Sequence, residues 1–219
     1  MQNSPAKIEI LFQEGFRKLL HFAVFVFIIP LRWFGWRYAF GFGIISFFWN
    51  LWIMPRWFRA SFRAEELARS RSLGMLFYSL CVALLSLAFP LPILASSWAV
   101  LSISDALSSI VGRFLGKTKL WWNKKKSWAG FFAYFISASI CGWIFFIWTR
   151  LNIASSSPFW LGAEVLAKMM VTNSAKIFLF STISAFFSSL AESLCRSFED
   201  NLIAPFVYGL VLCLLFIYL

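Results

Sequence analysis

The sequence predicts an all-α protein, a polytopic membrane helix bundle of about seven transmembrane helices, and three observations support this. Of the 219 residues, 61% are hydrophobic and 13% are charged, whereas about 25% are charged in an ordinary soluble domain. The 28 phenylalanines and 12 tryptophans have more apolar side-chain surface than the core of a soluble domain of this size can bury. Apolar runs recur along the chain without a polar stretch long enough for a soluble domain. Residues 1–219 are therefore expected to form a single integral membrane domain.

Seven apolar runs give the expected helices in order. They are residues 19–31, 38–54, 73–89, 91–111, 128–149, 177–194 and 202–219. A helix needs about 20 residues to cross the hydrocarbon, so the first run is expected to extend into its flanks, and residues 32–37 become the loop after it. Residues 158–171 are apolar but carry Glu164 and Lys168, which indicates an interfacial or partial helix.

The distribution of basic residues predicts the orientation of the chain. With seven spans, 15 of the 20 Lys and Arg fall on the side of the N-terminus, and five fall on the other side. The positive-inside rule places the first side in the cytoplasm and the C-terminus opposite it. Three polar clusters, far apart in the sequence, then come to the cytoplasmic face. This topology and anionic lipid headgroups explain the net charge of +11, so membrane lipids and no nucleic acid are the expected partners.

The first polar cluster is S-D-A-L-S-S-I-V-G-R-F-L-G-K-T-K, residues 104–119. It ends like a phosphate-binding P-loop, but three residues separate Gly112 from Gly116 where a P-loop has four, and the preceding residues read as membrane. Placing the carboxylate of Asp105 within a span costs free energy, so it is expected only where the carboxylate is paired, hydrated or functional. One alternative to a functional role is a salt bridge to Arg113 or to a loop lysine. The glycine spacing fits either helix packing or close approach to a phosphate.

The loop that follows, K-T-K-L-W-W-N-K-K-K-S-W, holds five lysines. Such a loop serves either as a topogenic, headgroup-binding patch or as positive charge for nucleotide phosphates.

The second cluster is A-E-S-L-C-R-S-F-E-D-N-L-I-A-P, directly before the last apolar run. It carries Glu192, Glu199, Asp200 and Asn201 with Arg196 as a nearby cation. This set favours a divalent metal, Mg²⁺ with nucleotide phosphates completing its shell. The alternative is helix capping by Asp200 or Asn201.

The third cluster is E-G-F-R-K-L-L-H, from Glu14 to His21, at the entry to the first run. His21 taken alone is more often a packing residue than a ligand. The three clusters in this order resemble the CTP-dependent polyprenol and lipid kinases, which include dolichol kinase, phytol kinase and the fungal CTP-dependent diacylglycerol kinase. That group also looks related to the phosphatidate cytidylyltransferases.

The resemblance implies a membrane kinase that transfers the γ-phosphoryl group of CTP to a lipid alcohol, namely a polyprenol, a phytol-like alcohol or diacylglycerol, with Mg²⁺ at the cytoplasmic face. It assigns catalytic or metal-binding roles to Asp105 and Asp200, supported by Glu192 and Asn201. The residues expected to bind or neutralise phosphates are Arg17, Lys18, Gly112, Gly116, Lys117, Lys126 and Ser127. Glu14 and His21 belong to the first motif of the pattern.

One departure weakens the match. Where the family usually has glutamate before a glycine, this chain has Ala129, which favours a divergent or non-catalytic membrane protein that kept the fold. A cytidylyltransferase making a CDP-lipid is the other alternative. A transporter would place polar residues near mid-membrane, whereas here they gather at one face.

Overall fold

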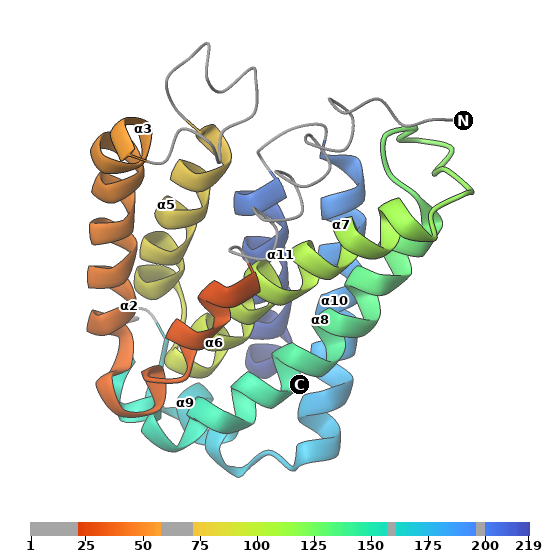
Figure 1. The fold of residues 1–219 in the computed structure, drawn as a ribbon. Coiled ribbons are helices and arrows are strands. Elements are labelled where there is room, and N and C mark those ends of the chain that lie inside the picture. The colour runs from red at the N-terminus through yellow and green to blue at the C-terminus, as the bar shows by residue number, and fades with distance from the viewer. Residues whose placement is uncertain (1–21, 58–71, 157–160, 196–199) are drawn as a thin grey trace, which may run out of the picture.

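The structure is a computed structural model that describes residues 22–57, 72–156, 161–195 and 200–219 (Figure 1). In these ranges the chain is helical, with one isolated β-bridge between Lys119 and Ser127 and no strand. The all-α prediction is confirmed. Its principal helices are α2 (Leu31–Phe48), α5 (Leu73–Ala88), α6 (Leu91–Ala99), α7 (Asp105–Phe114), α8 (Trp128–Thr149), α9 (Ala163–Val171), α10 (Ser174–Leu194) and α11 (Asp200–Tyr218).

Helical stretches match six of the seven apolar runs. Five stretches in the described ranges are long and apolar enough to cross a membrane: Leu31–Trp57, Leu91–Phe114, Trp128–Ser155, Ser174–Leu194 and Asp200–Tyr218. A sixth, α5, is apolar but has only 16 residues. A membrane bundle is therefore supported, and the exact number of spans stays a prediction.

The first apolar run differs from its predicted form. Its described part is a five-residue 3₁₀ helix, η1 (Val24–Ile28), after which Pro30 immediately precedes α2. Residues 32–37, expected to be a loop, lie inside α2 because proline's fixed φ starts a helix there. Gly35 kinks α2 with a φ of 70°, and a Cβ at this position would lie 2.6 Å from the Ser155 Cβ. Only glycine suits both the angle and this contact.

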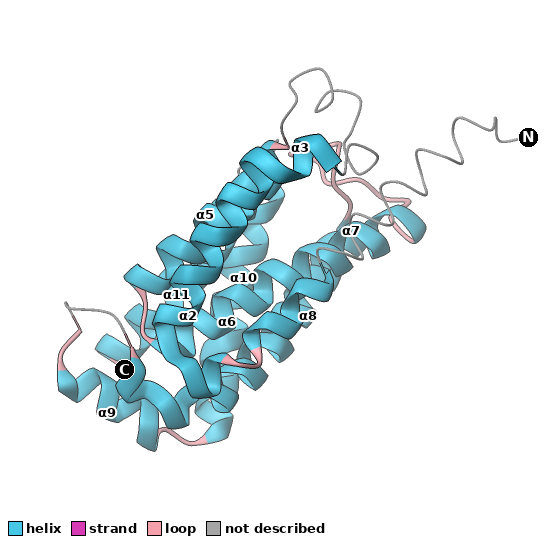
Figure 2. Cartoon of the chain, turned by 60° about the vertical axis from the view of Figure 1, so that its left-hand side comes forward, coloured by secondary structure: helices cyan, strands magenta, loops and turns pink. Residues whose placement is uncertain are grey.

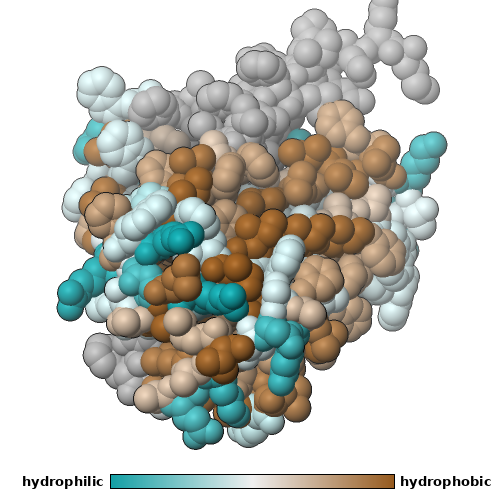
Figure 3. All heavy atoms as spheres, turned by 90° about the horizontal axis from the view of Figure 1, so that it is seen from below, coloured by the Kyte–Doolittle hydropathy of each residue, from teal (hydrophilic) through white to brown (hydrophobic). Residues whose placement is uncertain are grey.

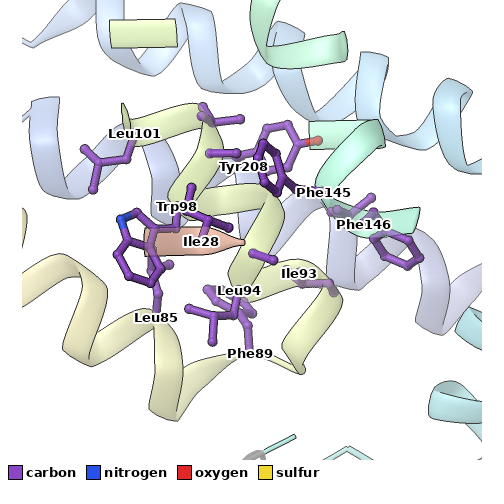
Figure 4. Close-up of a cluster of buried hydrophobic side chains, with 14 of the residues drawn as sticks. Ile28, Leu85, Phe89, Ile93, Leu94, Trp98, Leu101, Phe145, Phe146 and Tyr208 are labelled. Carbon is purple, nitrogen blue, oxygen red and sulfur yellow. The ribbon is translucent and has the colours of Figure 1, made fainter. Parts of the chain in front are cut away.

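A central helical stretch organises the bundle. It comprises α6, a π-helical segment η4 (Val100–Ser104) and α7, and every residue of α6 is buried. Figure 4 shows side chains of α6 packed together with side chains of neighbouring elements. These labelled side chains are Ile28, Leu85, Phe89, Ile93, Leu94, Trp98, Leu101, Phe145, Phe146 and Tyr208. Buried serines also occupy the helix contacts, as expected where small and hydrogen-bonding residues rather than the hydrophobic effect hold membrane helices together.

The outer helices leave apolar side chains exposed around the bundle. Ile45 of α2 is 70% exposed, Ile136 of α8 56% and Leu210 of α11 51%. Such surface is unstable in water but suits lipid. The neighbouring helices α8 and α10 pack against each other, as do α10 and α11, and α2 and α5 (Figures 1 and 2).

The packing defines two ends of the bundle. The last turn of α10 and the first turns of α8 and α11 meet near α7 at one end (Figure 1). At the opposite end lie α9 and the six-residue 3₁₀ segment η5 (Arg150–Ser155) that follows α8. The nine residues of α9 would span roughly 14 Å, too little to cross a bilayer, which agrees with the partial helix predicted there; residues 157–160 lie outside the described ranges.

Candidate functional site

Three carboxylates meet at the first of these ends. Asp105 is the first residue of α7, Glu192 lies in the last turn of α10, and Asp200 is the first residue of α11. One oxygen of each lies within 4.8 Å of the others. Asp105 and Glu192 are each 7% exposed, and Asp200 is half-buried. Carboxylates this close repel one another unless cations lie among them.

Local structure explains why these side chains point to one place. The π-helical segment η4 ends directly before Asp105, and such bulges change the direction in which the following side chains emerge and occur often at functional sites. Asp200 begins α11, where the helix dipole favours negative charge. The carboxylates therefore come from within the central helical stretch (Asp105), from the end of α10 (Glu192) and from the start of α11 (Asp200).

Lys126 lies against this cluster from the loop before α8. Its Nζ is 2.6 Å from Glu192 Oε1 and 3.4 Å from Asp200 Oδ2, and it also donates to the Glu192 carbonyl oxygen at 2.5 Å. Burial lowers the pKa of Lys126, but attraction by Glu192, Asp200 and Asp105 outweighs burial and raises that pKa above its ordinary value of 10.5. Lys126 is therefore charged at neutral pH and neutralises part of the cluster.

The other loop lysines point elsewhere. Lys117, Lys119, Lys124 and Lys125 are exposed, whereas Lys126 is half-buried. One lysine of the loop thus contacts the carboxylates, and the other four are exposed to solvent or lipid headgroups.

Two loop residues that the sequence did not single out hold Lys126 in place. Asn123 Nδ2 donates to the carbonyl oxygens of Ser193 at 2.9 Å and Cys195 at 3.2 Å, and Trp122 Nε1 donates to Ser193 Oγ at 3.1 Å. The two Asn123 bonds satisfy carbonyls at the end of α10 that have no partner within the helix. The only sequence feature that could have pointed to Asn123 is that it is an asparagine beside a run of lysines. The sequence does not tell which helix end this asparagine caps.

Replacing Asn123 with alanine is expected to loosen the loop. The variant loses two hydrogen bonds to α10, each of which stabilises the closed loop by about 1 kcal/mol. Local opening of the loop should therefore become more frequent by about tenfold or more. Hydrogen–deuterium exchange of the amides of residues 117–127 measures this opening. Lys124→Ala, a neighbouring change at an exposed side chain, is the control, and equal exchange in both variants would contradict the role of Asn123.

Both glycines of the first cluster lie close to Ser127. A Cβ at Gly112 would lie 3.2 Å from Ser127 Oγ, and one at Gly116 would overlap the Gly112 carbonyl oxygen and the Ser127 side chain. Ser127 caps α8, where its Oγ accepts from the Gly130 N–H at 3.2 Å. Gly112 thus permits α7 to lie close to the start of α8, whereas Gly116 lies in the loop after α7. Contact of either glycine with phosphate stays a prediction.

Gly130→Ala is expected to destabilise the protein by about 1–3 kcal/mol, the usual cost of overpacking. Its Cβ would lie 2.9 Å from the Ser108 carbonyl oxygen, a backbone atom that cannot rotate away. Gly41→Ala is the matched control, because that helical glycine has no heavy atom within 4 Å of the added Cβ. Thermal unfolding in detergent measures both variants, and an unchanged midpoint for Gly130→Ala would contradict the tight packing.

The remaining predicted residues lie as follows. The Asn201 Nδ2 donates to the Gly74 carbonyl oxygen at 3.1 Å and so ties α11 to α5. Ala129 is half-buried in the first turn of α8. Six residues of the predicted clusters lie outside the described ranges: Glu14, Arg17, Lys18, His21, Arg196 and Glu199.

The donor set fits a divalent metal ion. Mg²⁺ and Ca²⁺ prefer carboxylate oxygens, and Mg²⁺ usually takes one or two carboxylates and completes its shell with water and phosphate. Asp105, Glu192 and Asp200 offer one oxygen each within the separations given above. A cation at this position would compete with the Lys126 ammonium for Glu192 and Asp200.

Comparison with known proteins gives one partial similarity. No family model and no solved structure matches the chain. A curated protein of Triticum aestivum described as "Probable phytol kinase, chloroplastic" is 42% identical over 77 residues. The matched segment covers 34% of this chain and 24% of that protein, so the chain matches about a quarter of the relative's length. The similarity is to part of a kinase of a lipid alcohol.

Proposed function

We propose that this protein is a membrane lipid kinase that transfers the γ-phosphoryl group of CTP to the hydroxyl of a lipid alcohol. The carboxylate cluster of Asp105, Glu192 and Asp200, with Lys126 beside it at one end of an apolar bundle, is the observation that carries the proposal. The partial similarity to a phytol kinase supports a kinase. The acceptor class is a polyprenol, a phytol-like alcohol or diacylglycerol.

The arrangement suits a reaction between a greasy and a soluble substrate. The apolar outer faces of the helices favour the lipid tail, and the cluster lies at a bundle end, where a lipid hydroxyl meets water. We place this end in the cytoplasm, following the distribution of basic residues. CTP would then reach the cluster from the aqueous side.

The chain's own residues supply positioning and charge neutralisation, which dominate phosphoryl transfer. Asp105, Glu192 and Asp200 would hold Mg²⁺, which when bound neutralises and orients the phosphate oxygens. The lipid hydroxyl oxygen would attack the γ-phosphorus while a carboxylate oxygen of Asp105 or Asp200 accepts the hydroxyl proton. The bond between the γ-phosphorus and the bridging oxygen would break, and CDP would leave. Lys126 would turn its ammonium group from the carboxylates to the phosphates, with Lys117 at the loop surface adding positive charge.

The motif residues outside the cluster complete the proposal. Gly112, Gly116 and Ser127 would bring backbone and hydroxyl groups near the phosphates, while Asn201 would support Asp200. Arg17 and Lys18, which lie outside the described ranges, would neutralise phosphate charge as the resemblance implies.

Product analysis tests the proposal directly. Purified protein in detergent with Mg²⁺ is given γ-labelled CTP, or γ-labelled ATP, and a panel of lipid alcohols. We expect label from CTP in a lipid monophosphate, with CDP as the second product. Label from ATP alone would show that ATP is the donor. With phosphatidate in place of the lipid alcohol, formation of pyrophosphate and a CDP-lipid would indicate a cytidylyltransferase. No turnover, including none in Ala129→Glu, would favour a non-catalytic membrane protein.

A further inference from the structure

A groove lies at the end of α8 remote from the carboxylates. It encloses about 590 Å³ and runs beside the last turns of α8 and the start of α2. Its wall from α8 includes Ile144, Ile147 and Trp148, which fall on one helical face, and Leu151 continues this face. Ile144 and Leu151 are 47% and 64% exposed. The groove therefore offers an open apolar track along the helix.

Two arginines line the same groove. The Arg32 guanidinium lies over the Trp148 ring, 4.4 Å from its centroid, and Arg150 Nη1 donates to the Thr172 carbonyl oxygen at 3.1 Å. Both side chains are half-buried. Among the residues that the structure describes, no carboxylate forms an ion pair with either arginine. Two positive charges thus border an apolar groove, and no carboxylate of the described residues is paired with them.

The position of the groove matches a membrane interface. From Trp128, two residues after Lys126, the 22 residues of α8 extend roughly 33 Å, about the thickness of the hydrocarbon core. Trp143 and Trp148 lie near the remote end, where tryptophan is favoured at the headgroup level. Figure 3 looks onto this end of the bundle, where hydrophilic patches alternate with hydrophobic surface.

We propose that this groove is a binding site for an anionic phospholipid, with the headgroup phosphate on Arg32 and Arg150 and an acyl chain along Ile144, Ile147 and Leu151. Charge complementarity selects this occupant, because guanidinium groups bind phosphate oxygens in paired hydrogen bonds and the apolar track needs a hydrocarbon chain. The site lies at the other end of α8 from the proposed kinase site and does not depend on it.

Native mass spectrometry of the full chain in detergent tests the site with phosphatidylglycerol and phosphatidylcholine. We expect the wild type to retain phosphatidylglycerol over phosphatidylcholine, and Arg32→Gln to weaken that binding about fivefold, the usual effect of one basic residue on anionic lipid. Arg32→Lys should retain most of it. Arg37→Gln is the matched control, because Arg37 is an exposed arginine of the same helix that does not line the groove.

Three outcomes would overturn the proposal. Equal losses in Arg32→Gln and Arg37→Gln would indicate general surface charge. Equal retention of both lipids by the wild type would remove the anionic selectivity. Displacement of the lipid by inorganic phosphate at equal concentration would indicate a site for a free anion. Asp105→Asn should bind phosphatidylglycerol as the wild type does. Lipid binding at the groove therefore tests this proposal independently of the kinase activity.

Discussion

Asp105→Asn is expected to lower phosphoryl transfer by about 10³-fold while the protein keeps its fold. The change preserves the shape of the side chain but removes a negative charge from a buried cluster in which one oxygen each of Asp105, Glu192 and Asp200 lie within 4.8 Å of one another. The amide cannot accept a proton at neutral pH and is a weaker ligand for a divalent cation than a carboxylate. Loss of a general base or metal ligand has an effect of this size.

The assay is transfer of label from γ-labelled CTP to the lipid phase. Glu164→Gln is the matched control, because Glu164 lies in α9 at the opposite end of the bundle. A melting temperature near that of the wild type would show that Asp105→Asn is folded. Full transfer activity in Asp105→Asn would contradict the central role of this carboxylate.

Lys126→Met is expected to have opposite effects on nucleotide and on metal. The variant loses the ammonium group that would neutralise phosphates, so kcat/KM for CTP should fall about 10²-fold, as when one stabilising donor is removed from an active site. It also frees Glu192 and Asp200 from the ion pairs at 2.6 and 3.4 Å. Binding of Mn²⁺, measured by electron paramagnetic resonance in the absence of nucleotide, should therefore become tighter.

Lys125→Met is the control for this prediction, because Lys125 is the adjacent lysine and is exposed. The Lys126 variant is expected to be less stable without metal, because Glu192 is buried and loses its cation, and added Mn²⁺ should restore part of the melting temperature. Weaker Mn²⁺ binding in Lys126→Met would contradict competition between the lysine and the metal.

The sequence predicted the helices better than their ends. Six apolar runs coincide with helices because the length and composition of a membrane helix are local properties, set by the thickness of the hydrocarbon. The first run differed partly because the fixed φ of Pro30 starts α2 directly after it, which is a local effect. The kink at Gly35, by contrast, accompanies a contact with the distant Ser155. Such contacts leave no signal in the apolar pattern of residues 19–37.

For the candidate site, the sequence identified the chemistry and the structure identified the partners. Asp105, Glu192 and Asp200 stand out in the sequence because ionisable residues beside membrane spans are costly and need a reason. Which lysine meets them could not be read from five lysines in one loop. The bonds of Asn123 to the end of α10 decide it, because they fix the loop so that Lys126 points inward.

The sequence by itself determined that this is an apolar, all-helical chain with carboxylates and lysines at a few membrane edges, because composition and local pattern fix those properties. Only the tertiary structure decided that α7, α10 and α11 bring three carboxylates within 4.8 Å, and that Gly112 permits α7 to pack closely against the start of α8. These features depend on contacts between segments far apart in the chain, which are selected by side-chain packing between helices.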